Sequence, residues 1–408
     1  MSTPLRIGIV GGGIGGLALA LGLKHIVPEK QIHVDIYEAA GELKQVGAGI
    51  TMWPRALEIL KEMGLRETLE RRLSLDQQRG PKNDVHVYRK SDQKEGITIL
   101  ELETRGSQLF YRSELQDFLL EDTSSSNINL HTSHRLVSYE EKENSVDLTF
   151  KNGETATCDL LVGADGLNSV VRGCLLAQGK NWSQEEAYIK AQPVWSGTTI
   201  YRELLNADPI RRDYPNHGAL KQLNVYLGKS KHIVAYPVSQ GKVINVLVFF
   251  SDPEKHGTPM EGHSNSDNAT PDFISEFKGW EEDVRVIAMN LAKPSRWALQ
   301  TVRPLETYVS RRVVLMGDAA HAMETHLANG VGQAIEDAYI LSNIIAKALE
   351  KDSVNIPDLT KIYDTIRQPF GNFAVEASRN QGRLYELLAP GFEDVKEGEC
   401  VSAERLRS

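Results

Sequence analysis

The chain has 408 residues, a formal net charge of −9 and 41% hydrophobic residues. It is longer than one hydrophobic core usually supports, so we expect two domains. The excess of acidic residues argues against a nucleic-acid-binding protein, and no apolar run reaches the 18 residues of a membrane span. Three widely spaced cysteines, Cys158, Cys174 and Cys400, indicate a reducing compartment without a disulfide framework, so we expect a cytoplasmic protein.

Strands and helices alternate in the first part of the chain, as apolar periodicity and turn residues indicate. In chain order we predict strand Leu5–Val10, a helix to about Ile26, strand His33–Tyr37, helix Pro54–Met63, strands Val85–Tyr88 and Ile97–Leu102, helix Ser113–Leu120, and a hairpin of Val146–Phe150 and Thr155–Val162 around Asn152-Gly153.

The middle part, residues 176–292, changes character and predicts an antiparallel sheet. Its strand-like runs are Thr198–Tyr201, Leu223–Leu227, Ile233–Pro237 and Val243–Phe250. A buried strand at Arg312–Met316 and a long helix to about Leu349 then restore the first pattern, and the last twenty or so residues resemble a poorly ordered terminus.

This order predicts an α/β fold in which a Rossmann-like domain is built from both ends of the chain. We expect that domain to comprise 1–75, 105–175 and 293–385, with a C-terminal helical segment. A second domain with a mostly antiparallel β-sheet would comprise 76–104 and 176–292, and 386–408 would form a tail.

A glycine motif follows the first predicted strand. Gly11 permits a tight turn, Gly13 lets the backbone approach a pyrophosphate, and Gly16 lets helix and strand pack closely. Glu38, 22 residues after Gly16, ends the next strand, where a carboxylate accepts hydrogen bonds from a ribose. This context favours a dinucleotide site over a purely structural glycine turn.

A second motif, Gly317-Asp318-Ala319-Ala320-His321, directly follows the strand near the C-terminus. An aspartate at the carboxyl end of a parallel strand is placed to bind a ligand such as the ribityl chain of a flavin, although helix capping is the alternative. Gly330, Val331 and Gly332 open the next helix, so their N–H groups would stabilise negative charge on a reduced flavin ring.

A third motif, Gly163-Ala164-Asp165-Gly166, follows another buried strand. Asp-Gly is also an ordinary turn pair, so Asp165 by itself is equally consistent with a structural turn. Its position between the other two motifs favours a functional role.

Together the three motifs resemble those of the single-component FAD-dependent aromatic monooxygenases, and the stretch 317–338 resembles the salicylate-hydroxylase-like branch. The resemblance covers Ile7 to Asp337 and implies FAD as cofactor and NADPH or NADH as co-substrate. It also implies that O2 hydroxylates a phenolic or aromatic carboxylic small molecule through a flavin C4a-hydroperoxide.

The resemblance also assigns roles to individual residues. Glu38 would bind the adenosine ribose, Ala48 and Gly49 would line the FAD, Arg112 would lie at the pyrophosphate, Asp318 at the ribitol, Val331 would contact the flavin through its backbone, and Asp165 would serve both FAD and NAD(P)H.

Two positions depart from the family pattern beside the flavin. Thr325 stands where a proline is usual, and Ala328 replaces a common glycine. Flavin binding should survive both changes, but the local geometry above the ring is in question.

The substrate is expected on one face of the middle sheet. By the resemblance, Arg202 and Tyr236 anchor the phenolate, although a surface arginine and a core aromatic are the alternatives. His232, Val234 and Tyr236 should share a face because strand side chains alternate, and His232 is favoured as a satisfied sheet residue over a base. We expect Trp297 to pack between domains.

Other functions are also consistent with the sequence. The same flavin chemistry supports oxidative decarboxylation, dearomatisation or epoxidation, a flavin reductase or oxidase would not incorporate oxygen, and a GDP-dissociation-inhibitor-like binder would lack flavin. No metal is expected, since His321 and His326 are five residues apart and no HExxH occurs. The chain would act as a monomer or homodimer, with neither nucleic acid nor membrane as partner.

Overall fold

The computed structural model describes residues 3–43, 49–77, 85–104, 106–123, 125–178, 183–258, 271–351 and 354–407. The chain divides into two compact units. The first comprises Met1–Gly80, Ser107–Pro193 and Thr301–Ser378, and the second comprises Pro81–Gly106, Val194–Gln300 and Arg379–Ser408.

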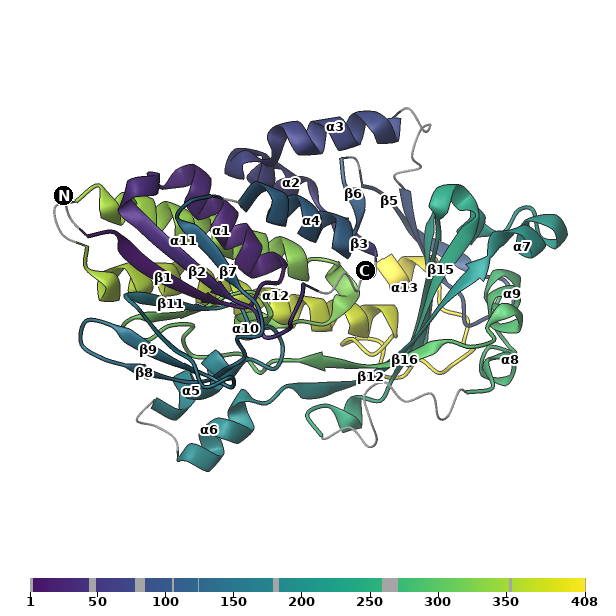
Figure 1. Ribbon diagram of the computed structural model, residues 1–408. Helices are drawn as coiled ribbons and strands as arrows, with labels where there is room; N and C mark the ends of the chain where they lie inside the picture. The colour runs from purple at the N-terminus through teal and green to yellow at the C-terminus, as the bar shows by residue number, and fades with distance from the viewer. Residues whose placement is uncertain are drawn as a thin grey trace. The chain divides into compact units, whose positions relative to one another are not determined.

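A five-stranded parallel sheet forms the centre of the first unit (Figure 1). Val10 is opposite Tyr37 on one side and Gly163 on the other, and Gly163 is opposite Leu315, so four strands end at the same edge. In sheet order the strands are β17 (Val313–Leu315), β11 (Leu160–Gly163), β1 (Leu5–Val10), β2 (Ile32–Tyr37) and β7 (Ile128–His131).

The strand sequences explain why this sheet is buried. Every residue of β11 and of β17 is buried, as expected for parallel strands that are covered on both faces. Helix α1 (Ile14–Ile26) packs against α4 (Arg112–Thr123) and α11 (Gly330–Leu349). The prediction of a Rossmann-like domain is therefore confirmed.

A three-stranded antiparallel sheet adds Leu148 and Phe150 to the same core. It is formed by β8 (Leu136–Glu141), β9 (Val146–Phe150) and β10 (Thr155–Cys158). The predicted hairpin is present, but the prediction that its second strand continues to Val162 is wrong. The chain breaks at Asp159, and the fully buried residues that follow join the parallel sheet instead.

The predicted helix over Pro54–Met63 ends where expected, because the next residue, Gly64, has a φ of +104° and leaves the helical conformation. The remaining elements of the first unit are η1 (Glu29–Gln31), the paired strands β3 (Gly49–Met52) and β6 (Gln108–Tyr111), α2 (Pro54–Leu60), η2 (Lys61–Leu65), α3 (Arg66–Gln77), α5 (Val170–Gln178), α6 (Gln184–Ala191), α10 (Asp318–His321), η6 (Thr325–Leu327) and α12 (Ile356–Tyr385), which runs on into the second unit.

A seven-stranded, mostly antiparallel sheet forms the second unit, with one parallel pair between β13 and β4. In sheet order the strands are β16 (Ser295–Thr301), β12 (Val194–Asn206), β15 (Val243–Ser251), β14 (Lys231–Val238), β13 (Leu223–Gly228), β4 (Val85–Lys90) and β5 (Ile97–Glu103). The other elements are α7 (Ala207–Asp213), η3 (Gly218–Leu220), η4 (Ser239–Gly241), η5 (Pro253–Lys255), α8 (Phe273–Glu276), α9 (Glu282–Asn290) and α13 (Ala403–Arg407).

The C-terminal residues form part of the second unit, and the expectation of a poorly ordered tail is wrong for the residues described. Leu387, Val395 and Val401 are buried together. The Lys229 ammonium donates to the carbonyl oxygens of Leu387 at 2.8 Å and Phe392 at 2.9 Å. These contacts were hidden in the sequence because the segment is polar overall.

Within the described part of the chain, no helix has both the length and the apolar character needed to cross a membrane.

Candidate functional site

The glycine loop after β1 has two crowded positions and one open position. Gly11 has a φ of +112°, and a Cβ on it would lie 2.3 Å from the Ala164 carbonyl oxygen. A Cβ on Gly16 would lie 2.0 Å from the carbonyl oxygen of Gly11. A Cβ on Gly13 would meet nothing within 4 Å, so the backbone at the start of α1 is open to a phosphate.

Glu38 lies directly after β2 and is only partly used by the chain. Its Oε2 accepts from the Gly12 N–H at 2.9 Å, and its Oε1 accepts from the Ala40 N–H at 2.7 Å. A carboxylate has about four acceptor positions, and the described residues fill two of them, which leaves two for a pair of ribose hydroxyls.

Two charged residues at this end of the unit have no partner among the described residues. Asp318 begins α10 and Arg112 begins α4, and both are exposed without a hydrogen bond or ion pair. Gly49 is opposite Tyr111 in the β3–β6 pair, one residue before Arg112. Ala48 lies outside the described residues.

Asp165 has a different environment. Its carboxylate accepts from the N–H groups of Val170 at 2.7 Å and Val171 at 3.1 Å and from the Ser169 hydroxyl, so it caps α5. Burial raises the pKa of Asp165, partly offset by these hydrogen bonds. The sequence left a structural turn as the alternative for Asp165, and the structure shows a helix cap that the sequence did not indicate. Direct contact with FAD or NAD(P)H stays a prediction.

Arg172 is a residue whose importance the sequence did not reveal. It is fully buried, and its guanidinium donates to the carbonyl oxygens of Ala191 at 2.9 Å, Ala319 at 2.9 Å and Leu167 at 2.5 Å. Burial lowers the pKa of Arg172 to about 10. It thereby connects the loop after β11 to α10, and the only sequence signal was its place six residues after the third motif.

The start of α11 offers free backbone donors. The first bond from this helix start is Gln333 N–H to the Asn329 carbonyl, so the N–H groups of Gly330, Val331 and Gly332 have no acceptor within the helix. Trp53 holds the preceding loop, since its Nε1 donates to the Leu327 carbonyl at 3.2 Å.

The two departures from the family pattern lie in this loop. Thr325 is exposed and begins η6, and Ala328 ends it in the left-handed region with φ +48° and ψ +36°. The backbone therefore keeps a conformation that glycine adopts without cost, and the alanine Cβ is strained there.

We predict that Ala328→Gly raises the free energy of unfolding by about 1 kcal/mol, because it removes the left-handed alanine. Urea unfolding of the flavin-free protein measures this. Ala348→Gly, within α11, is the matched control and should lower stability by about 1 kcal/mol. A loss of stability in Ala328→Gly would contradict the inference that the backbone at Ala328 is strained.

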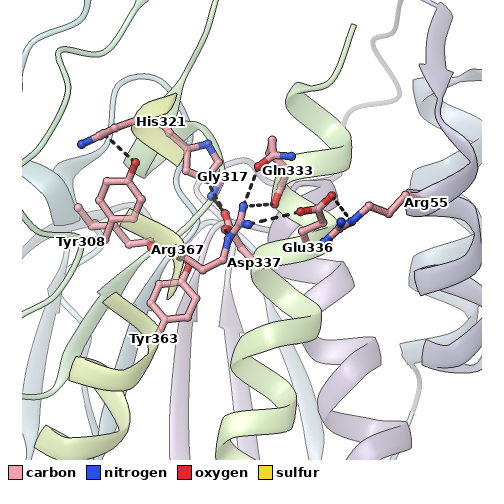
Figure 2. Close-up of polar contacts among 11 residues, drawn as sticks. Arg55, Tyr308, Gly317, His321, Gln333, Glu336, Asp337, Tyr363 and Arg367 are labelled. Carbon is pink, nitrogen blue, oxygen red and sulfur yellow. Dashed lines mark hydrogen bonds and ion pairs between the residues drawn. The ribbon is translucent and has the colours of Figure 1, made fainter. Parts of the chain in front are cut away.

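A buried polar network connects Gly317, the residue before Asp318, to Asp337 and Arg367 (Figure 2). The fully buried Asp337 carboxylate on α11 accepts from the Gly317 N–H at 2.8 Å, from His321 Nε2 at 2.7 Å and from Arg367 Nε at 2.5 Å. These bonds join the β17–α10 turn to α11 and α12.

Arg367 extends the network along α11. Its guanidinium donates to Gln333 Oε1 at 2.8 Å and pairs with Glu336 at 3.4 Å. Glu336 also pairs with the exposed Arg55 at 3.0 Å, so the chain of charges runs from the core to the surface (Figure 2). These contacts give Glu336 and Asp337 a structural role.

Asp337 also has a pH-dependent contribution to stability. Burial alone raises its pKa, but attraction by His321 and Arg367 and their hydrogen bonds outweigh burial, so the pKa lies below its ordinary value of 3.8. A depressed pKa stabilises the folded state above the ordinary value, and this contribution is lost as the pH falls through the folded value.

We predict that Asp337→Asn costs about 3 kcal/mol of stability at pH 7, because Arg367 keeps its buried charge without the carboxylate. The difference from wild type should shrink below pH 3.8. Urea unfolding over a pH series checks both points. In Asp337→Asn/Arg367→Met the two losses should be less than additive, and strict additivity would refute the coupling.

The second unit places the predicted substrate residues on one face of its sheet. Arg202 on β12 is opposite Leu247, which is opposite Val234, and Tyr236 is opposite Asn245. Because side chains alternate, all five point to the same side, while the other side carries the core covered by α7, α8 and α9.

Arg202 is half-buried and donates from Nε to Asn245 Oδ1 at 3.0 Å. No described residue accepts a hydrogen bond from its two terminal nitrogens. The Asn245 amide therefore orients the Arg202 guanidinium, whose two terminal nitrogens have no acceptor among the described residues.

His232 and Trp297 differ in their burial within the second unit. His232 is buried, stacks on Phe249 with centroids 4.1 Å apart, and lies 3.0 Å from Glu386 Oε1, as a structural sheet histidine does. Trp297 on β16 is 44% exposed and its Nε1 donates to the Ser295 hydroxyl, and its packing between the domains stays a prediction.

His326, which the sequence brought up only as a metal ligand to exclude, is buried beside an acidic side chain. Its side chain is 2% exposed and its Nε2 lies 3.1 Å from the buried Glu324 carboxylate, just before the Ala328 turn. Over the described ranges, no group of three or more His, Cys, Asp or Glu side chains is arranged to hold a metal ion.

Known proteins match this chain in both sequence and fold. The family described as "FAD binding domain" matches residues 5–198 and 229–378. The chain is 33% identical to salicylate hydroxylase of Pseudomonas putida, over 95% of this chain and 87% of that protein. It is 30% identical to 6-methylsalicylate 1-monooxygenase of Aspergillus terreus, over 94% and 84%. A solved salicylate hydroxylase substrate complex superposes with a TM-score of 0.83 at 28% identity, covering 99% of this chain and 93% of that one.

Proposed function

Since the chain belongs to the FAD-dependent aromatic monooxygenases that resemble salicylate hydroxylase, we propose that its substrate is a 2-hydroxybenzoate. The protein is an FAD-dependent monooxygenase that hydroxylates an aromatic ring. Bound FAD supplies the electron transfer from NAD(P)H, the co-substrate typical of this family, and the activation of O2. The names of two relatives, salicylate hydroxylase and 6-methylsalicylate 1-monooxygenase, support a ring with adjacent hydroxyl and carboxylate groups.

We propose that residues of the first unit hold the FAD. The open backbone at Gly13 and the exposed Arg112 suit the pyrophosphate, and the free acceptor positions of Glu38 suit the adenosine ribose. The unpaired carboxylate of Asp318 suits the ribityl hydroxyls. The free N–H groups around Val331 suit the electron-rich edge of the flavin ring.

Arg202 carries the proposal for the substrate. A guanidinium whose outer two nitrogens are free binds a carboxylate or phenolate through two parallel hydrogen bonds. Asn245 fixes the orientation of the fork through Nε, and Tyr236 lies on the same sheet face with a hydroxyl for the phenolic oxygen. These residues orient the ring and favour its ionised, electron-rich form.

We predict that Glu38→Gln raises the dissociation constant of FAD about tenfold, because the ribose loses a charged acceptor. Flavin fluorescence titration of the apoprotein measures it. Glu140→Gln, on the exposed side of β8, is the control and should leave FAD binding unchanged. Equal affinity in Glu38→Gln and wild type would remove Glu38 from the FAD site.

We predict that Arg202→Gln raises KM for salicylate at least tenfold while FAD binding is unchanged, because the lost fork binds the carboxylate. For phenols without a carboxylate the increase in KM should be much smaller. NAD(P)H oxidation, 18O incorporation and CO2 release over a substrate panel measure this and separate simple from decarboxylative hydroxylation. Arg211→Gln, on the surface helix α7, is the control. An unchanged KM in Arg202→Gln would disprove the proposed substrate role.

A further inference from the structure

The loop that joins α10 to α11 carries a strained residue next to the proposed position of the flavin ring. Ala328 lies in the left-handed region, and Asn329 then leads directly into the first turn of α11. A residue other than glycine keeps such a conformation only where surrounding contacts hold it there. The contacts of this loop therefore decide where the first turn of α11 lies.

Side chains from distant parts of the first unit hold the loop at both ends. At the α11 end, the half-buried Trp53 donates from its indole Nε1 to the carbonyl oxygen of Leu327, the residue before Ala328, at 3.2 Å. At the other end, the buried Ser378 hydroxyl on α12 donates to the Glu324 carbonyl oxygen at 2.6 Å. Of these two bonds, the Trp53 bond lies beside the strained residue and is the one placed to keep it left-handed.

Trp53 is itself fixed to α11 by the helix that it precedes. It occupies the N-cap position of α2. The next turn of α2 lies against the start of α11, since a Cβ added to Gly332 would be 3.7 Å from the Ala56 Cβ. Arg55 pairs through Nε with Glu336 on the second turn of α11 at 3.0 Å (Figure 2). The indole N–H therefore belongs to the same packed assembly as the helix start.

The N–H groups of Gly330, Val331 and Gly332 need a fixed direction to act on a flavin. Hydride transfer from NAD(P)H leaves NAD(P)+ and adds one negative charge to the flavin. Backbone donors stabilise such a charge most when they are oriented before it forms. These three N–H groups have no acceptor within the helix, so the turn that precedes them sets their direction.

We propose that Trp53 is a positioning residue for flavin reduction. Its indole N–H fixes the turn at Leu327 and Ala328, and the fixed turn keeps the N–H groups of residues 330–332 aligned with the reduced flavin ring. This inference rests on the proposed binding of the flavin ring at these groups. A tryptophan that only packed against its neighbours would need its ring and not its N–H, and this difference makes the role testable.

Trp53→Phe in the flavin-bound protein tests the proposal, because it keeps an aromatic ring and removes the indole donor. The dissociation constant of oxidised FAD should change little, whereas reduced FAD should bind about tenfold more weakly. For a two-electron couple, this tenfold change lowers the midpoint potential by about 30 mV. Fluorescence titration measures the binding of oxidised FAD, and anaerobic titration against a reference dye measures the potential.

Two further variants complete the experiment. Trp195 in the second unit donates from Nε1 to the Thr198 carbonyl oxygen at 2.7 Å, so Trp195→Phe removes the same kind of bond elsewhere and should leave the potential unchanged. Val331→Pro tests the flavin placement separately, because it deletes one N–H that has no helical acceptor, in a first turn that accepts proline. It should also lower the potential.

The outcomes separate this inference from the proposed function. A lowered potential in Val331→Pro with a wild-type potential in Trp53→Phe would overturn the role of Trp53 and leave the flavin placement intact. A wild-type potential in both variants would overturn the flavin placement and the role of Trp53 together. An equal fall in Trp195→Phe would show that the effect is not specific to this turn and would also refute the inference.

Discussion

The buried Asp337 carboxylate and its three partners hold together the segments that follow β17 at the carboxyl edge of the parallel sheet. By accepting from Gly317, His321 and Arg367, it attaches the turn before Asp318 to α11 and α12. A charge at this depth is tolerated only when it is paired and hydrogen-bonded. The position of Asp318 at the end of β17 is therefore a consequence of a second, hidden aspartate.

The acidic residues at this edge of the sheet differ in how many of their carboxylate acceptor positions the protein itself fills. Asp165 uses its carboxylate to cap α5, and Glu38 uses half of its acceptor positions on backbone N–H groups. Asp318 has no partner in the described part of the chain and is free for a ligand. A carboxylate binds a cofactor only with the acceptor positions that the protein leaves empty, and this favours Glu38 and Asp318 as the FAD-binding residues.

In the second unit, side chains alternate along each strand, so one face of the sheet is buried and the other carries the proposed substrate residues. The face of β12, β14 and β15 that carries Val246 and Val248 is closed by helices, whereas the opposite face carries Arg202 and Tyr236. A rigid sheet thus holds Arg202 and Tyr236 on one face, where we propose that the substrate binds. Precise placement of an aromatic ring is what a hydroxylating enzyme requires, since the cofactor carries the oxygen chemistry.

The sequence by itself determined the fold class, the glycine loop, the family and the shared face of His232 and Tyr236, because these follow from patterns between residues close in the chain. Only the tertiary structure decided that Asp165 caps a helix, that Arg172 is buried and that the C-terminal segment packs. The partners of such groups come from distant segments: Arg172 and the Ala319 carbonyl are 147 residues apart. Whether a polar side chain is satisfied or free depends on packing, and local sequence carries almost no record of it.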